Sequence, residues 1–382
     1  MSMKPVQAVA LHAAVALRRA IHRRAPSSIN QWVAGLIVLL PALLPAQAQV
    51  TVSQNGEAAY SQAIAVPPGV SGMAPQLGLF YSGGGINGPV GRGWSIQGLS
   101  SITRCPAIRA VDGHSIDDRV CLDGQRLIQT DASGNPLPFP QANDAQGLAS
   151  GYREFRTEKD TYARIRAYGL ANGDTSGASG PAYFKVWTKA GQVYEYGASP
   201  SADANTKALI SPYNKTVAVA WAVSRLGDTL GNAIDFKYEQ RDIAWGTGSK
   251  VGHEWNVAEI QYSGNKVVFA YADRAPTAPQ DAAETYHQGS KNVSLRLLQS
   301  ITTYVNSPNT AILGATSDAV AAKTVKLTYD NGPITGRSRL RTLQECAGGA
   351  VSTRCLPATS FQYAAGGNDA YQASNKPAIG TT

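Results

Sequence analysis

The 382-residue sequence lacks the short motifs that mark several common kinds of enzyme. It has no G-x-x-x-x-G-K-[S/T] run, so a P-loop for nucleoside triphosphates has no support. It has no G-x-S-x-G nucleophile elbow of the α/β-hydrolase kind. The pair Gly91-x-Gly93 has no third glycine and no helical segment after it, so it is not a dinucleotide fingerprint. These absences favour a role other than nucleotide-dependent or serine-hydrolase chemistry.

Histidine is scarce, and its positions do not suit a metal site. Three histidines lie beyond residue 48, at His114, His253 and His287. His253-Glu254 starts like the zinc motif H-E-x-x-H, but Val257 occupies the second histidine position. We interpret that pair as part of a polar loop before a strand. Acids gather at Asp112, Asp117, Asp118 and Asp123 without the spacing of an EF-hand, so solvated turn carboxylates are favoured over a calcium site. We predict no metal and no cofactor.

The sequence has little basic charge outside its first 48 residues. The formal charge is +8, from 34 Lys and Arg against 26 Asp and Glu. Five of the basic residues and none of the acids precede residue 49, so the rest carries 34 − 5 = 29 basic residues against 26 acids, or +3. Nucleic-acid binding needs a clustered basic surface. We therefore predict no nucleic-acid partner.

The apolar run Trp32–Leu44 is short for a membrane span and is broken by Pro41. Arginines precede it, and Ala46-Gln47-Ala48 follows it as an A-x-A cleavage site. Residues 1–48 are therefore predicted to be a cleaved signal peptide, and an uncleaved anchor is the alternative. The mature protein would be secreted, with no stable membrane anchor after cleavage.

Cysteine is also scarce, but the number after cleavage is even. The four cysteines are Cys105, Cys121, Cys346 and Cys355. None has C-x-x-C spacing, and an even count in an exported protein favours disulfides. Of the three pairings, Cys105–Cys121 and Cys346–Cys355 are favoured because each closes a short loop, contributing about 2–3 kcal/mol in the chain-entropy model.

The abundant residues indicate an all-β chain. Glycine (38) and proline (21) supply many turns, and the hydrophobic content of 43% is enough for a packed core. Leu77, Leu79 and Tyr81 alternate as on one face of a strand. The next segment holds the glycines that we expect to set a sharp turn, and Trp94 should pack beside it; these glycines are Gly83, Gly84, Gly85, Gly91 and Gly93.

A repeat occupies the second half of the chain. The pattern Gly-Asn-x-[Ile/Val]-x-Phe-x-Tyr begins at Gly231-Asn232 and again at Gly264-Asn265, a spacing of 264 − 231 = 33 residues. Val325–Tyr329 and Ser360–Tyr363 keep parts of it. Each copy predicts a β-hairpin whose tip carries Gly-Asn or another polar loop. One hairpin cannot bury its apolar face alone, so the hairpins should join in an antiparallel, shell-like sheet. An ordinary β-sandwich is the alternative.

The glycine-rich stretch resembles the start of the SpvB-type family, which includes SpvB virulence proteins, B subunits of insecticidal toxin complexes and related Rhs/YD-repeat proteins. The matching segments are Ile64–Gly69, Gly72–Leu77, Tyr81–Gly85, Asn87–Ile96, Gly98–Cys105, Asp118–Arg119 and Cys121–Leu127. The repeat at Asp228–Asn232 also looks like a divergent Rhs/YD unit. The resemblance implies an SpvB-like β-rich domain over residues 49–365, followed by a linker or tail over 366–382.

The resemblance implies a non-enzymatic, secreted scaffold that forms part of a shell. Its expected partners are downstream toxin or Rhs modules, or other subunits of a toxin complex. Some SpvB proteins carry an ADP-ribosyltransferase domain with a Glu-x-Glu pair far downstream, and this chain has no Glu-x-Glu. One alternative is an extracellular module that binds glycan or protein through loops such as Thr130–Gly151 and Ala275–Lys291. Another is a hydrolase with carboxylates that are dispersed in the sequence. Tyrosines on the strands could bind sugars, but cross-strand pairs that support the sheet are favoured.

Overall fold

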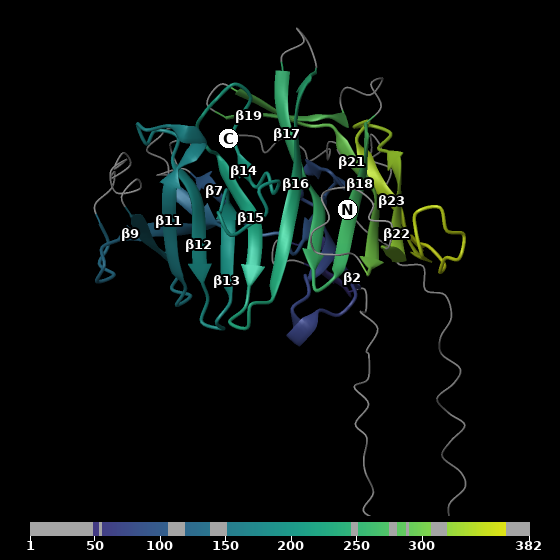
Figure 1. Cartoon of the computed structure of the whole chain (residues 1–382). Coiled ribbons are helices and arrows are strands. Elements are labelled where there is room, and N and C mark those ends of the chain that lie inside the picture. Colours follow the sequence, from purple (N-terminus) through teal and green to yellow (C-terminus); the bar gives the residue numbers. More distant parts are fainter. Residues whose placement is uncertain are drawn as a thin grey trace, which may run out of the picture.

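The computed structural model of the chain describes residues 49–52, 56–105, 119–137, 151–245, 251–274, 281–287, 290–306 and 319–363 (Figure 1). The predicted signal peptide and C-terminal tail lie outside these ranges. Within them the helical elements are two 3-10 turns, η1 (Val70–Gly72) and η2 (Ala171–Gly173), and the remaining elements are strands. None of the helical elements in the described ranges is long and apolar enough to cross a bilayer. The predicted all-β class is confirmed.

The first half of the chain forms a closed ring of antiparallel strands. The ring consists of β7 (Ser101–Cys105), β8 (Arg119–Leu122), β9 (Gln125–Thr130), β10 (Tyr152–Thr157), β11 (Arg164–Leu170), β12 (Pro181–Trp187), β13 (Val193–Gly197) and β15 (Ala220–Gly227). Each strand pairs with the next. Strand β15 closes the ring because Ala220–Ala222 pairs with β7 while Val223–Gly227 pairs with β13.

The second half continues from β15 as an open sheet of hairpins. Its strands are β16 (Ala233–Ala244), β17 (Val251–Tyr262), β18 (Asn265–Asp273), β21 (Arg296–Val305), β22 (Val320–Asn331), β23 (Ser338–Ala347) and β24 (Thr359–Ser360). Figure 1 shows the long strands β16 and β17 between the ring strands on one side and β21–β23 on the other. Two smaller additions are β14 (Leu209–Ile210), beside β15, and the hairpin β19 (Ala283–His287) with β20 (Ser290–Ser294), beside β17. The predicted antiparallel, hairpin-rich sheet is confirmed.

The glycine-rich stretch forms a separate small sheet. Its strands are β1 (Gln49–Val52), β2 (Ala58–Ile64), β3 (Leu77–Ser82) and β6 (Trp94–Gln97), with the two-residue strands β4 (Asn87–Gly88) and β5 (Gly91–Arg92) between β3 and β6. Leu77, Leu79 and Tyr81 are all buried, as their alternation predicts. Trp94 contacts the ring of Phe361 at 4.8 Å and donates its Nε1–H to the Tyr363 hydroxyl at 2.9 Å. The first sheet therefore packs against the last described residues.

The repeated tyrosines form a ladder across the open sheet. Each donates its hydroxyl to a backbone carbonyl of an earlier strand; the four bonds are Tyr238 to Val223 (3.0 Å), Tyr271 to Val257 (2.8 Å), Tyr329 to Leu298 (2.5 Å) and Tyr363 to Leu340 (2.9 Å). The strand register shifts by one residue at the same places, where the pairs are Tyr238–Val257, Tyr271–Leu298 and Tyr329–Leu340. A β-bulge increases local twist and bends the strand. The repeat in the sequence is therefore a repeat of bulges, each beside a tyrosine that is buried (Tyr238) or partly buried (Tyr271 and Tyr329).

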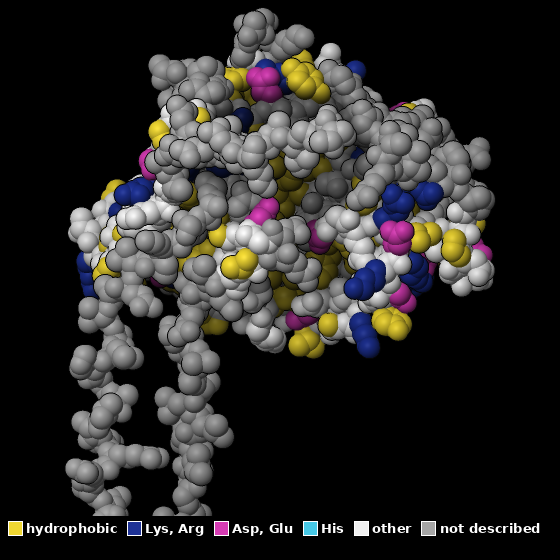
Figure 2. All heavy atoms as spheres, turned by 180° about the vertical axis from the view of Figure 1, so that it is seen from behind, with side chains coloured by type: hydrophobic (Ala, Val, Ile, Leu, Met, Phe, Trp, Pro, Cys, Tyr) yellow, Lys and Arg dark blue, Asp and Glu magenta, His cyan; other side chains and the backbone are white. Residues whose placement is uncertain are grey.

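Apolar and charged side chains occupy different parts of the face that is turned away from the viewer in Figure 1. Figure 2 shows hydrophobic side chains near the centre of this face and both signs of charge towards its edge, on the part of the face that the structure describes. The main apolar core is continuous, and it includes Tyr60 of the small sheet, Trp221 of the ring and Ile301 of the open sheet. The small sheet, the ring and the open sheet therefore share one core.

Candidate functional site

Close approach distinguishes Gly84 and Gly85 from Gly83, where a Cβ would meet nothing nearer than 3.7 Å. Gly83, Gly84 and Gly85 do not have positive φ. Gly84 donates its N–H to Glu57 Oε2 at 3.1 Å, and a Cβ on Gly84 would lie 2.5 Å from the other oxygen of that carboxylate. A Cβ on Gly85 would lie 2.9 Å from the backbone of Gly93.

The two later glycines, by contrast, have left-handed backbone angles. Gly91 has φ +86° and Gly93 has φ +82°, which favour glycine. A Cβ on Gly91 would lie 2.8 Å from the backbone oxygen of Ser338, at the start of β23. A Cβ on Gly93 would lie 2.7 Å from the Tyr81 ring. Strand β5 therefore contacts the open sheet through a glycine that has no room for a side chain.

A buried ion pair holds this hairpin against the open sheet. Arg274 donates to Asp281 Oδ1 at 2.9 Å and to the Gly88 carbonyl at 2.6 Å. Asp281 accepts from the Ser338 N–H at 2.6 Å and the Ser338 hydroxyl at 2.5 Å, and its backbone oxygen accepts from Asn87 Nδ2. Burial alone would raise the pKa of Asp281, but the hydrogen bonds from Ser338 and the Arg274 charge outweigh it and lower that pKa. We call Asn87, Arg274, Asp281 and Ser338 the latch.

The predicted Gly-Asn tips lie at hairpin turns and have structural contacts. At the first tip, Asp228 Oδ1 accepts from the N–H groups of Leu230 and Asn232, and Asn232 Nδ2 donates to Asp228 Oδ2 at 2.7 Å. Gly231 has φ +86° there, with nothing near its Cβ position. The hydrogen bonds from Asn232 lower the pKa of Asp228. The first tip is therefore held by hydrogen bonds to the carboxylate of its own Asp228.

The second tip reaches the small sheet. Gly264 has φ +73° in the turn between β17 and β18. Asn265 Nδ2 donates to the Pro68 carbonyl at 3.4 Å, and the preceding Ser263 Oγ accepts from the Val70 N–H at 3.0 Å. These contacts fix the segment between β2 and β3.

A second turn with the same hydrogen bonds to an aspartate carboxylate was not predicted from the sequence. Asp131 Oδ1 accepts from the N–H groups of Ser133 and Asn135, and Asn135 Nδ2 donates to Asp131 Oδ2 at 3.0 Å. These are the bonds of the first tip. The shared letters Asp-x-x-Gly-Asn at 131–135 and 228–232 were the available signal.

Both favoured disulfide pairings are present. Cys105–Cys121 joins β7 to β8 within the ring, and Cys346–Cys355 joins the end of β23 to the segment before β24. No cysteine is free in the described residues. One staple therefore lies in each half of the chain.

The interpretation of His253 and Glu254 as a polar loop is wrong, because both lie inside strand β17. Glu254 is buried and accepts from Arg241 at 2.7 Å and from the N–H groups of Leu295 and Arg296. His253 Nδ1 lies 2.8 Å from Asp242 Oδ1. These partners allow charged side chains to be buried within a strand, which a local pattern does not reveal.

The acid cluster and the other histidines give little further evidence on whether the protein holds a metal ion. Among the described residues, no group of three His, Cys, Asp or Glu side chains could hold a metal ion. His114 and three of the four clustered acids, Asp112, Asp117 and Asp118, lie outside the described residues, as does the side chain of His287. The fourth, Asp123, accepts from the N–H and hydroxyl of neighbouring serines.

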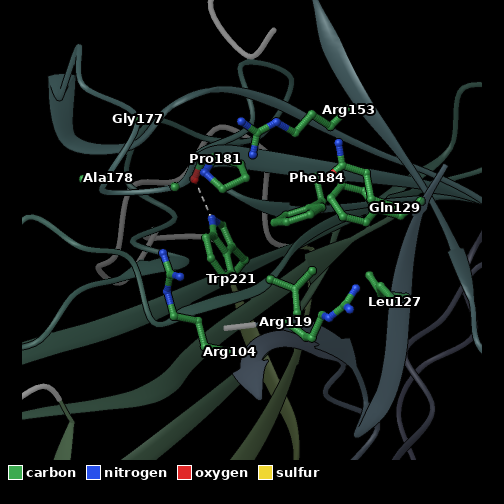
Figure 3. Close-up of a pocket in the computed structure, with 13 residues that line it drawn as sticks. Arg104, Arg119, Leu127, Gln129, Arg153, Gly177, Ala178, Pro181, Phe184 and Trp221 are labelled. Carbon is green, nitrogen blue, oxygen red and sulfur yellow. Dashed lines mark hydrogen bonds between the residues drawn. The ribbon is translucent and has the colours of Figure 1, made fainter. Parts of the chain in front are cut away.

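A cavity of about 70 Å³ is lined by residues of the ring strands and of the loop before β12 (Figure 3). Its lining includes Arg104, Arg119 and Arg153 from β7, β8 and β10, and the apolar side chains Phe155, Phe184 and Trp221. Figure 3 shows the three arginines around Trp221 and Phe184. Trp221 donates its Nε1–H to the Pro181 carbonyl at 2.8 Å, and its ring centroid lies 5.1 Å from that of Phe184. Sequence reasoning did not identify this cavity, because its residues come from six strands and one loop.

Tyrosines on β10, β11 and β12 form a row across the ring. Tyr152 pairs with Tyr168, and Tyr168 pairs with Tyr183. The Tyr168 and Tyr183 rings stack with centroids 5.0 Å apart, and the Arg166 guanidinium lies 3.6 Å from the Tyr152 ring centroid. These are the cross-strand contacts that the sequence favoured.

Comparison with known proteins begins with a family model. The model described as "Salmonella virulence plasmid 65kDa B protein", SpvB, matches residues 52–256. Relatives named "Mono(ADP-ribosyl)transferase SpvB" match as well. The one from Salmonella enteritidis is 33% identical over 151 residues, covering 37% of this chain and 25% of the relative. One from Salmonella typhimurium is 26% identical over 352 residues, covering 79% of this chain and 56% of the relative. The chain therefore spans between a quarter and about half of these relatives.

Solved structures share the fold. The N-terminal domain of the effector protein SpvB from Salmonella typhimurium strain LT2 has a TM-score of 0.55 at 20% identity, covering 75% of this chain and 98% of that domain. The structure of TcdB2-TccC3 has a TM-score of 0.62 at 17% identity, covering 83% of this chain and 17% of that one. A Photorhabdus luminescens Tc holotoxin pore also matches, with a TM-score of 0.55 at 16% identity, over 78% of this chain and 15% of that one.

These relatives correct one prediction and establish the family. We expected a chain that is not an enzyme, whereas the relatives carry the name of a mono(ADP-ribosyl)transferase. The expectation rested on motifs missing from this sequence, and such motifs can lie in parts of a relative that this chain does not match. The matched structure is the N-terminal domain of that protein. The family model covers more than half of this sequence, and the chain therefore belongs to the SpvB family.

Proposed function

We propose that the chain is the exported N-terminal scaffold of a toxin or virulence protein, in which it forms part of the wall of a protective shell. Its likeness to the SpvB N-terminal domain and to Tc toxin structures supports a toxin-complex N-terminal domain. The wall role is the further step of the proposal. Its support comes from the way in which the sheet begins and ends.

The observation that carries the proposal is a sheet whose first strands close into a ring, while the pairing of its last strand, β24, among the described residues is with β23. The ring removes sheet edges because β15 pairs with both β7 and β13. At the other end, β24 pairs with β23 only at Thr342 and Leu343. An open edge offers unpaired N–H and C=O groups to another strand. A wall that is continued by further polypeptide needs such an edge.

The partners in this proposal are downstream toxin or Rhs modules, or other subunits of a toxin complex. Export through the segment 1–48 fits two disulfides, because disulfides persist in oxidising compartments. A shell of paired strands satisfies its own backbone groups, so it would protect an enclosed polypeptide from proteases.

The test is the intact mass of the protein that its own cell exports, with and without reduction. A mass well above that of residues 49–382, or a toxin polypeptide that copurifies, is expected. A photo-crosslinker at Ser360, on the open-edge strand, should capture that polypeptide. The same group at Tyr162, which is 75% exposed in the ring, should capture less. A lone exported chain with the mass of residues 49–382 and no crosslinked product would overturn the proposal.

One observation favours a second candidate function, the binding of a glycan or protein. The row Tyr152, Tyr168 and Tyr183 carries Arg166 beside it and is partly exposed. Stacked aromatic rings with a polar neighbour can bind sugar faces. Binding of the intact protein to a glycan panel, lost in Tyr152→Ala with unchanged circular dichroism, is the expected result. An equal response from Tyr162→Ala would contradict it.

A further inference from the structure

The outer face of the ring carries rows of aromatic and charged side chains on β10, β11 and β12. Phe155, Ile165 and Phe184 are buried on the inner side of these strands. Their neighbours in the sequence point outward, because side chains alternate along a strand. The register arranges the outward side chains in three rows across the strands, which are Tyr152 with Tyr168 and Tyr183, Glu154 with Arg166 and Lys185, and Arg164 with Trp187.

Arg164 has hydrogen-bonding groups that the fold leaves available. Its side chain is 51% exposed, and it contacts Glu154 through Nε alone, at 3.5 Å. Within the part of the chain that the structure describes, its two terminal guanidinium nitrogens donate no hydrogen bond. The guanidinium lies 5.9 Å from the ring centroid of Trp187, its register partner. An anion can therefore pair with Arg164 beside an aromatic ring.

The surroundings of Arg164 carry a net positive charge. Arg156 and Arg166 contact the Glu154 carboxylate at 2.9 and 3.1 Å, so these two arginines hold the surface in place. Lys185 is paired with Glu195 of β13 at 3.0 Å. The outward charged residues of β10–β13 are four basic and two acidic, 4 − 2 = +2; they are Arg156, Arg164, Arg166, Lys185, Glu154 and Glu195. A surface with this balance attracts anions.

The tyrosine row supplies the apolar part of the surface. Tyr152 is 41% exposed. Gly197 is the register partner of Tyr183 on β13, and it adds no side chain beside that ring. Tyr168 lies four residues along β11 from Arg164, which is about 13 Å in a strand. A ligand that contacts both the tyrosine row and Arg164 must therefore be longer than one sugar ring.

The backbone of these strands has nothing to offer a ligand. Strands β10, β11 and β12 each pair with a neighbour on both sides. An extended peptide usually binds a sheet by adding a strand to a free edge, and these internal strands have none. The ligand must be recognised by side chains. Aromatic rings bind the apolar faces of sugars, and a guanidinium pairs with acidic oxygens.

We propose that this face binds an acidic glycan, a chain of sugars that bears carboxylate or sulfate groups; this ligand class rests on the second candidate function given above. The sugar rings lie on the tyrosine row, and an acidic group of the same chain pairs with Arg164 beside Trp187. Glycan binding alone needs only the aromatic row. The available guanidinium and the net charge select the acidic class.

The test is calorimetric titration of the full chain with two matched pairs of glycans at one ionic strength. Dextran sulfate is paired with dextran, and oligogalacturonate with its methyl ester, so each pair compares an acidic glycan with a neutral one. At least one acidic member should bind about tenfold more tightly than its neutral partner, the effect of one hydrogen-bonded charge pair. The pair that responds distinguishes sulfate from carboxylate.

Equal affinity for the acidic and neutral members would leave glycan binding in place and overturn the acidic class. No binding of any of the four would overturn both. Polyglutamate is the control for the kind of polymer. If it binds as tightly as the acidic glycans, the ligand is an acidic polypeptide and the proposal is wrong.

Two substitutions locate the binding. Arg164→Gln should weaken binding of the acidic glycan about tenfold. It should leave the circular dichroism spectrum unchanged, because Glu154 keeps its other two arginine partners. The matched control is Arg354→Gln, which removes the same charge from an exposed arginine in the last described segment. Equal weakening by both variants would show a general charge effect and overturn the site.

Discussion

Gly91 and Gly231 have the same backbone angle but different surroundings, so together they separate two roles of glycine. Both have φ +86°. A Cβ on Gly91 would lie 2.8 Å from the Ser338 carbonyl oxygen, whereas nothing lies within 4 Å of that position on Gly231. Both Gly→Ala changes should cost about 1–2 kcal/mol for the left-handed angle. Gly91→Ala should cost about 1–3 kcal/mol more, because a backbone atom must move.

Urea denaturation of the two alanine variants measures this difference in the free energy of unfolding. Gly91→Val adds a branched side chain at the same place and should disrupt folding. Equal stability losses for Gly91→Ala and Gly231→Ala would show that the contact with Ser338 relaxes freely, and that the hairpin does not depend on close approach.

At the residue scale, the sequence identified structurally important residues better than it identified the contacts that make them important. Alternation alone predicted the buried face of Leu77, Leu79 and Tyr81. The glycines could be located from the sequence, but the close approach at Gly84 is to Glu57, the residue directly before β2. The latch residues Arg274 and Asp281 gave no local signal at all. Their partners Gly88 and Ser338 are distant in sequence, and only the fold brings them together.

At the element scale, the tyrosine ladder makes each hairpin depend on the strand before it. The Tyr238 side chain is 1% exposed and donates to the Val223 carbonyl. Tyr238→Phe leaves that buried acceptor without its partner, which should cost about 1–3 kcal/mol. Tyr162→Phe, at a hydroxyl on a 75% exposed residue, should change stability by less than about 0.5 kcal/mol. Thermal unfolding of both variants compares them, and similar losses would argue that the ladder contributes nothing.

The latch should make stability depend on pH. The folded-state pKa of Asp281 is lowered, so its contribution is present above the unfolded value of about 3.9 and is lost as pH falls through the folded value. Asp281→Asn leaves Arg274 buried without an ionised partner and should cost about 3–5 kcal/mol near pH 7. The gap between native protein and variant should begin to narrow below about pH 4, where the Asp281 carboxyl of the unfolded chain takes up a proton, and should close as pH falls through the lowered folded-state pKa.

The matched control for the latch is Asp330→Asn, which removes a partner of Arg339 whose side chain is 36% exposed. An exposed ion pair contributes about 0–1 kcal/mol, so this variant should remain close to the native protein. Free energies of unfolding from pH 3 to pH 7 provide the comparison. A constant gap for Asp281→Asn across that range would mean that its carboxylate charge does not stabilise the latch.

The sequence also predicted the elements better than their connections. The hairpin repeat predicted the strands β16 and β18 and their shared buried residues, because alternation is a local property. The closure of the ring depends on pairing between β15 and β7, more than a hundred residues apart in the chain. Neither strand has a sequence feature that identifies the other as its pairing partner. The arginine-lined cavity depends on this closure, so it could not be predicted either.

At the scale of the whole molecule, the chain closes its core with its last described residues. Phe361 is 6% exposed and contacts Tyr60 at 5.3 Å and Trp94 at 4.8 Å between ring centroids. The small sheet comes first in the sequence, but its packing is complete only with Phe361, near the end of the described residues. Because the main core runs continuously through the small sheet, the ring and the open sheet, damage at this junction should destabilise the whole protein rather than one end.

Phe361→Ala should cost about 3–5 kcal/mol, the usual loss for truncating a buried phenylalanine. Leu356→Ala, in the same final segment but at a residue that is 62% exposed, should cost less than about 0.5 kcal/mol. The unfolding curves of Phe361→Ala, followed by tryptophan fluorescence and by far-ultraviolet circular dichroism, should shift together, because one core unfolds as one unit. A fluorescence transition that moves while the circular dichroism transition stays would mean that the small sheet unfolds separately. Phe361 would then stabilise only the small sheet.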